Sequence, residues 1–230
     1  MPAPTDPAGE QMRALAAVAV PLLGLTAGLV LVTGGAEAWR YALLLSSRTD
    51  AVPATPLHAS DVMVVTGGVV SLLSAALAGL VTLGWLIHAA AAASQAAAIA
   101  PIRSRWQLVA GVLLPGMNLV APGAVLAELE HAALRQDPER RPRPSPLVIG
   151  WWVTWVVGVL LAGIALLWDL RDGVQARADG VLLHIATDLV AGAVAITTIL
   201  VVKRMTWLLS PVALAGSRRM VVMKVSGGIR

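Results

Sequence analysis

Cysteine and phenylalanine are missing from this 230-residue chain, and charged residues are scarce. The lack of cysteine excludes disulfides and thiolate metal sites. Charged residues make up 13% of the chain, whereas about 25% is usual for a soluble domain. So little charge leaves too little polar surface to cover a water-soluble globule, and this excludes a soluble single domain.

Apolar residues are abundant instead and arrive in long runs. They make up 57% of the chain, with a mean hydropathy of +0.78. A helix needs about 20 apolar residues to cross a hydrocarbon core of about 30 Å. The sequence therefore predicts an all-α, polytopic membrane helix bundle with about four spans, at 14–36, 62–90, 147–168 and 181–203.

These spans predict a single membrane domain over 13–207, preceded by a disordered tail (1–12) and followed by a basic cytoplasmic tail (208–230). Residues 36–38, Ala-Glu-Ala, resemble a signal-peptidase site. The apolar run before them has about 20 residues, longer than the roughly 7–15 of a cleaved signal peptide. We therefore expect the first span to be an uncleaved anchor.

A fifth stretch, 107–127, is apolar but carries helix-breaking residues in its middle: Pro115, Gly116, Asn118 and Pro122. Proline removes a backbone donor and clashes with the preceding turn, and freed backbone groups cannot face lipid. We therefore predict a proline-broken re-entrant or interfacial segment over 107–136. Its two halves would meet at Pro115–Pro122, with Pro122 in the first turn of a helix that runs to about Gln136.

The distribution of lysine and arginine predicts the orientation. With four spans, 13 of the 17 basic residues lie on the side of both termini and 4 on the other. If 107–127 crossed, the two sides would hold 5 and 12, with the N-terminus outside. The positive-inside rule favours the first arrangement, in the bacterial inner (plasma) membrane with both termini cytoplasmic. The net charge of +4 then indicates attraction to anionic lipid headgroups rather than to nucleic acid.

Tryptophans and small residues mark two further features. The tryptophans are predicted to form interfacial belts, with six near the cytoplasmic side and two near the outer side: Trp85, Trp106, Trp151, Trp152, Trp155, Trp207; Trp39, Trp168. Small residues recur at fourth positions and permit close helix contact, either within the bundle or with a partner's helix: Gly24 and Gly28; Ser71, Ala75 and Gly79; Gly158 and Ala162.

Over roughly residues 80–165 the sequence carries a more specific pattern. It consists of a tryptophan, a Pro-x-x-Asn-Leu-x-x-Pro segment, an acidic helix and a Trp-Trp pair that opens the next span: Trp85, Pro115, Asn118, Pro122, Glu128, Trp151, Trp152. This pattern resembles a family of actinobacterial multi-pass membrane proteins known as domain of unknown function four-three-two-eight. The resemblance implies the fold and brings no activity with it.

Asp188, His184 and Asn118 are the candidate binding or transport residues. Asp188 lies about 10 Å inside the fourth span at 1.5 Å per residue, where an ionisable side chain is costly, and His184 is one turn earlier on the same face. The pair could relay a proton or cation, or be a buried structural pair. Asn118 could bond backbone groups released by the prolines or bind a substrate, as broken segments do in transporters.

Glu128 and His131, three residues apart, have the spacing of bundle metal ligands, but an interfacial amphipathic helix also explains them. No phosphate-binding glycine loop, nucleophile elbow, zincin helix or DNA-reading module occurs. We therefore expect no catalytic residues, metal or cofactor. The leading hypothesis is a non-enzymatic accessory or interaction subunit of a bacterial envelope assembly, with a membrane-protein partner or through self-association. The alternative is a small transporter or channel that uses Asp188 and the Pro115–Pro122 break.

Overall fold

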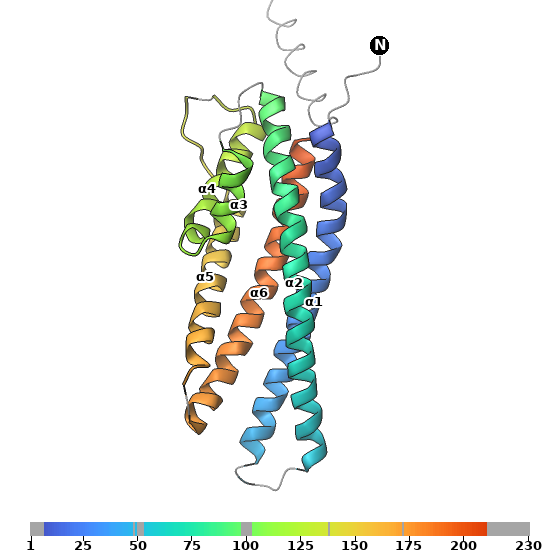
Figure 1. Ribbon diagram of the computed structural model, residues 1–230, viewed down its shortest axis with the longest axis vertical. Coiled ribbons are helices and arrows are strands. Elements are labelled where there is room, and N and C mark those ends of the chain that lie inside the picture. Colours follow the sequence, from blue (N-terminus) through green and yellow to red (C-terminus); the bar gives the residue numbers. More distant parts are fainter. Residues whose placement is uncertain are drawn as a thin grey trace, which may run out of the picture. The chain divides into compact units, whose positions relative to one another are not determined.

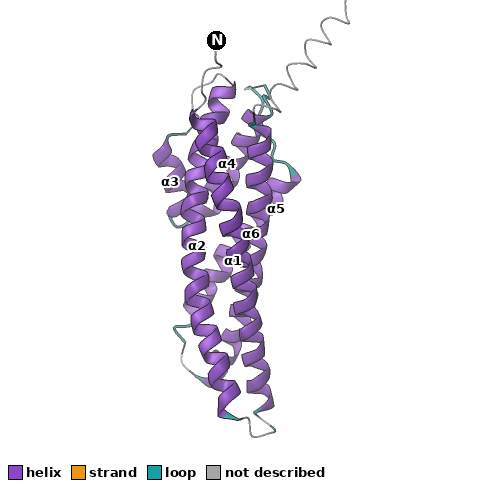
Figure 2. Cartoon of the chain, turned by 90° about the vertical axis from the view of Figure 1, so that its right-hand side faces the viewer, coloured by secondary structure: helices purple, strands orange, loops and turns teal. Residues whose placement is uncertain are grey.

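The computed structural model describes residues 7–47, 49, 53–97, 103–137, 139–171 and 173–210. Regular structure in these residues is entirely helical (Figure 2). The helices are labelled in Figure 1: α1 (Pro7–Ser46), α2 (Ala54–Ala97), α3 (Arg105–Leu113), α4 (Met117–Ala133), α5 (Pro146–Trp168) and α6 (Val174–Leu208). Four are long and apolar enough to cross a membrane, namely α1, α2, α5 and the part of α6 over Asp179–Leu208. The predicted all-α class is confirmed.

Each predicted span lies within one of these helices, but two helices are much longer than the spans. α1 has 40 residues and α2 has 44. α1 begins at Pro7, since proline is well suited to the first helical position, and Met12 is buried. The prediction of a disordered tail is therefore wrong for residues 7–12. Residues 1–6 of that tail and 211–230 of the basic tail lie outside the described residues.

The chain divides into two compact units, to which all four long helices contribute. Unit 1 comprises Met1–Val20, Val81–Ile149 and Leu200–Arg230, and unit 2 comprises Pro21–Leu80 and Gly150–Ile199. α3 and α4 belong wholly to unit 1.

In unit 2, α1 and α2 pack antiparallel through polar side chains. Residue numbers rise along α1 as they fall along α2 in three contacts: Thr26 Oγ1 to Ser74 Oγ at 2.8 Å, Thr33 Oγ1 to Ser71 Oγ at 3.2 Å, and Arg40 Nε to Asp61 Oδ1 at 3.1 Å. Thr26 donates its own proton to the carbonyl of Leu22, so Ser74 is the donor in the first contact. Such interhelical hydroxyl bonds contribute roughly 0.6–2 kcal/mol each in membranes.

α5 and α6 form the second antiparallel pair of unit 2. Trp151 donates from Nε1 to Oγ1 of Thr198 at 2.8 Å and stacks on Trp155, with ring centroids 5.6 Å apart. A Cβ added at Gly158 would lie 3.4 Å from a methyl of Val194, at ordinary van der Waals distance, so α5 and α6 pack against each other at this glycine. Trp151 is buried. Its indole N–H is satisfied inside the unit, and the predicted interfacial belt stays a prediction.

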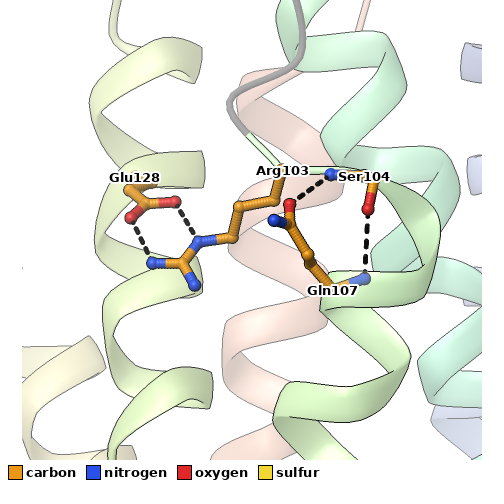
Figure 3. A network of polar contacts seen from close by, with 4 residues as sticks. All are labelled: Arg103, Ser104, Gln107 and Glu128. Atoms are coloured by element: carbon orange, nitrogen blue, oxygen red, sulfur yellow. Dashed lines mark hydrogen bonds and ion pairs between the residues drawn. The ribbon is translucent and has the colours of Figure 1, made fainter.

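In unit 1, α3 and α4 form an antiparallel hairpin (Figure 1). Ser104 caps α3 in a capping box with Gln107, and each residue's side chain accepts the other's backbone N–H (Figure 3). The Arg103 guanidinium reaches across to Glu128 on α4 with two bonds of 2.8 Å. Nearer the turn, a Cβ added at Gly111 would lie 2.9 Å from the Cβ of Ala121. The chain therefore folds back on itself.

The reversal is sharper than the sequence predicts. α3 ends at Leu113, and Gly116 takes a φ of +82°, in the left-handed region that glycine adopts without strain. α4 then begins at Met117, so Pro122 lies inside α4 rather than in the first turn, and α4 ends at Ala133 rather than near Gln136. Proline is tolerated there because it forgoes only one helical hydrogen bond, close to the start of the helix.

A buried glutamate holds the hairpin to the rest of unit 1. Glu130 is 1% exposed, and its Oε1 lies 2.6 Å from Nη2 of Arg204 on α6. Its Oε2 accepts the backbone N–H of Ser145, just before α5, at 2.9 Å. Trp85 joins α2 to α6, since its Nε1 donates to Oγ1 of Thr206 at 3.1 Å. These bonds tie α4 and α2 to α6.

Candidate functional site

Unit 2 holds a group of ionisable side chains where α1 and α6 pack. The register of this pair follows from two glycines. A Cβ added at Gly192 would lie 3.4 Å from Leu31, and one at Gly34 would lie 3.2 Å from the Cβ of Asp188. The two helices therefore run antiparallel: the step from Leu31 to Gly34 on α1 corresponds to the step from Gly192 back to Asp188 on α6. One helical turn beyond Gly34, Glu37 therefore faces the turn of α6 between His184 and Asp188.

Glu37 is buried without a partner for one of its oxygens. The residue is 9% exposed, and its Oε2 has no hydrogen-bond partner among the described residues. The charges that act on its carboxyl come from Asp188 and His184 on α6, Arg40 on α1 and Asp169 at the end of α5. An acidic side chain in such surroundings is costly.

Asp188 and His184, which the sequence singles out, both belong to this group. His184 binds Asp169 rather than Asp188, however, with Nε2 at 3.1 Å from Oδ1. The side chains of His184 and Asp169 are 38% and 54% exposed. The group therefore runs from two partly exposed side chains to two that lie between helices.

The approach of Asp188 to α1 depends on Gly34. With any side chain at this position, the nearest atoms of Asp188 would have to move by a few tenths of an ångström, since the added Cβ would lie 3.2 Å from Cβ and 3.5 Å from Oδ2. The neighbouring Gly35 has open space instead. One glycine of the Gly34-Gly35 pair thus brings a carboxylate against the α1 backbone.

The chemistry that these groups can perform is proton exchange. Two carboxyls and an imidazole differ in exposure and lie on one helix–helix contact, and all three can take up and release protons. No set of three or more His, Asp or Glu side chains among the described residues is arranged to hold a metal ion.

The remaining sequence candidates lie in unit 1, apart from this group. Asn118 is in the first turn of α4, and its backbone N–H donates to the carbonyl of Leu114 at 3.1 Å. Glu128 binds Arg103, and the hydrogen bond to Glu128 raises the pKa of Arg103. His131 Nε2 is 3.0 Å from the carbonyl of Asp137. Glu128 and His131 thus have separate protein partners.

Sequence reasoning missed Glu37 and Asp169 as site residues, because both lie just outside the apolar runs predicted as spans 14–36 and 147–168. A signal for Glu37 is present in the sequence. Thr26, Thr33 and Glu37 are spaced by seven and four residues, which places them on one face of a helix. Both threonines bond α2, so a polar face of α1 extends from Glu37 back to Thr26.

The long apolar helices define the class of protein. Four long apolar helices in an all-helical chain are those of a multi-pass membrane protein. Residues 48–207 match the family model Domain of unknown function (DUF4328), and the chain belongs to this family. Comparisons with curated proteins and with solved structures find no significant match.

Proposed function

We propose that this chain is a small, non-enzymatic membrane carrier or channel for protons or small cations that works through Asp188. The observation that carries the proposal is the buried Glu37 carboxyl, which faces Asp188 across the α1–α6 contact and has an oxygen without a partner. Ionisable residues inside a membrane are expensive and usually serve pathways for ions or protons. The Pro115–Pro122 break lies in unit 1, and the proposal does not depend on it.

The proposed setting is a bacterial inner membrane with both termini in the cytoplasm. The α3–α4 hairpin would then be a re-entrant segment that enters from the cytoplasmic side. α3 has nine residues, about 14 Å at 1.5 Å per residue, close to half of a hydrocarbon core of about 30 Å. The tip is apolar and exposed, with Leu113, Leu114 and Met117 available to lipid.

Flux measured on the purified protein in liposomes tests this function. With a pH-sensitive dye inside and an imposed ion gradient, the wild type should move protons or a cation, and Asp188→Asn should reduce the rate at least tenfold. Glu139→Gln is the control, because Glu139 is an exposed carboxylate in unit 1 and lies outside the group around Asp188; this variant should keep its flux. Liposomes that contain the wild type and show no flux above empty liposomes would refute the proposal.

A second candidate is the accessory or interaction subunit that the sequence favours, and the exposed face of α1 supports it. Cβ atoms added at Gly24 and Gly28 would meet nothing within 4 Å. Glycine weakens a helix by about 0.5–1 kcal/mol relative to alanine, and close contact with another helix would offset this cost. Gly24→Leu with Gly28→Leu should abolish co-purification or self-association in native membranes. Gly163→Leu, on the open side of α5, is the control.

A further inference from the structure

Glu37 and Asp188 have no ion-pair partner of their own among the described residues. Of the cations nearby, Arg40 on α1 is bound to Asp61 of α2 at 3.1 Å. His184 on α6 is bound to Asp169 at the end of α5 at 3.1 Å. These are the titratable groups that face Glu37 and Asp188 from the four helices. Each cation already has a carboxylate, so two carboxyls are left over.

Two carboxylates that face each other in apolar surroundings repel, and burial disfavours the charge on each. A single proton on the pair removes one charge and allows a carboxylic acid to donate to the remaining carboxylate. The Oε2 of Glu37 has no hydrogen-bond partner among the described residues, so it is available for such a bond. A metal cation is a poorer occupant, since hard cations need about six oxygen ligands and the described residues offer no set of three ligating side chains.

We propose that Glu37 and Asp188 bind one proton between them and exchange it with water through His184 and Asp169. This rests on the proposed carrier function for its role in transport, and it names the ion as a proton. It also places the aqueous opening at the partly exposed side chains of His184 and Asp169. That is the end of unit 2 where α5 ends and α6 begins.

The transfer is balanced at each step. A hydronium ion at the exposed end protonates the neutral imidazole of His184 and leaves water, and Asp169 at 3.1 Å from Nε2 stabilises the imidazolium. The imidazolium gives one N–H proton to a carboxylate oxygen of Asp188, one helical turn away. His184 returns to the neutral form, and the Glu37–Asp188 pair has gained one proton. His184 and Asp169 are thus a relay, and the carboxyls of Glu37 and Asp188 are the binding site.

Infrared spectroscopy of the full chain in lipid nanodiscs measures the bound proton directly through the carbonyl stretch of a protonated carboxyl. At neutral pH, where exposed carboxyls are ionised, the wild type and the control Glu139→Gln, which removes an exposed carboxyl of unit 1, should both show this band. The double variant Glu37→Gln with Asp188→Asn should lack it. The inference is overturned if the wild type has no such band at neutral pH, or if the band survives in the double variant. Replacing choline chloride by sodium chloride should leave the band unchanged, and its loss with sodium would instead assign the site to a metal cation.

The relay has a separate readout. After a pH jump, the band should change at least tenfold more slowly in His184→Gln than in the wild type, with the same final amplitude. An unchanged rate overturns the route through His184. A band without any proton flux in liposomes would refute the carrier function and keep the binding site. Flux of another cation without the band would refute the proton-binding site and keep the carrier function.

Discussion

Glu37 and Glu130 are both buried acidic residues on helices, yet their surroundings differ. Glu130 is 1% exposed; its Oε1 forms an ion pair with the guanidinium of Arg204, and its Oε2 accepts the backbone N–H of Ser145. Glu37 is buried to a similar degree but retains an oxygen without a partner. A satisfied buried ion pair is well explained as a structural tie. At the scale of single residues, Glu130 has an ion-pair partner and Glu37 has none among the described residues.

The sequence predicts part of this residue-scale picture. Asp188 and His184 stand out because they are ionisable and lie inside an apolar run. Glu37 does not, because it follows the apolar run of its own helix and resembles a loop charge. Which α1 residues face Asp188 depends on the register between α1 and α6, and that register follows from close contacts at Gly34 and Gly192. Contacts between distant segments cannot be deduced from the periodicity of one helix.

Adjacent glycines give a matched test of that contact. In Gly34→Ala the new Cβ would lie 3.2 Å from the Cβ of Asp188, so α1 and α6 must separate slightly. We expect a lower melting temperature in detergent, by a destabilisation of about 1–3 kcal/mol typical of overpacking. Gly35→Ala meets open space and should be neutral or more stable by about 0.5–1 kcal/mol, through helix propensity. Equal melting temperatures for the two variants would contradict the α1–α6 register.

At the scale of elements, the α3–α4 hairpin shows what proline and glycine determine. Their presence in 107–127 predicts a broken segment, and the structure contains one. The turn lies at Pro115 and Gly116, where Gly116 takes a positive φ, and Pro122 is accommodated within α4. Two prolines seven residues apart look equivalent in sequence. Only the contact between α3 and α4 distinguishes the one that ends a helix.

The packing of that hairpin can be tested by a compensating pair of substitutions. Gly111→Ala would place a Cβ 2.9 Å from that of Ala121, closer than two such atoms can lie. We expect it to lower the free energy of unfolding by about 1–3 kcal/mol, measured by thermal denaturation in detergent. Adding Ala121→Gly should restore most of the loss, because it removes the opposing methyl group. Failure of this double variant to recover stability beyond Gly111→Ala would mean that α3 and α4 do not meet at these residues.

At the scale of the whole molecule, hydropathy and the distribution of basic residues predict more of the architecture than local residue patterns do. The four apolar runs predict four long helices, and the structure has them. The lengths of α1 and α2 were underestimated, because a helix can extend beyond its apolar run wherever the residues outside it find packing partners, as Met12 does in unit 1. The sidedness rests on the distribution of 17 basic residues. It requires the hairpin to return to the side from which it starts.

Labelling of single cysteines in intact cells tests that sidedness, and the natural lack of cysteine makes each introduced thiol unique. Ser104 and Gln136 are exposed residues before α3 and after α4, and Ser47 is an exposed residue after α1. A membrane-impermeant thiol reagent added outside should label Ser47→Cys and spare both Ser104→Cys and Gln136→Cys until the cells are permeabilised. Label on Ser104→Cys and Gln136→Cys but not on Ser47→Cys would keep the hairpin and invert the orientation. Label on only one of the hairpin pair would place its ends on opposite sides of the bilayer, and the re-entrant segment and the cytoplasmic assignment of both termini would then be wrong together.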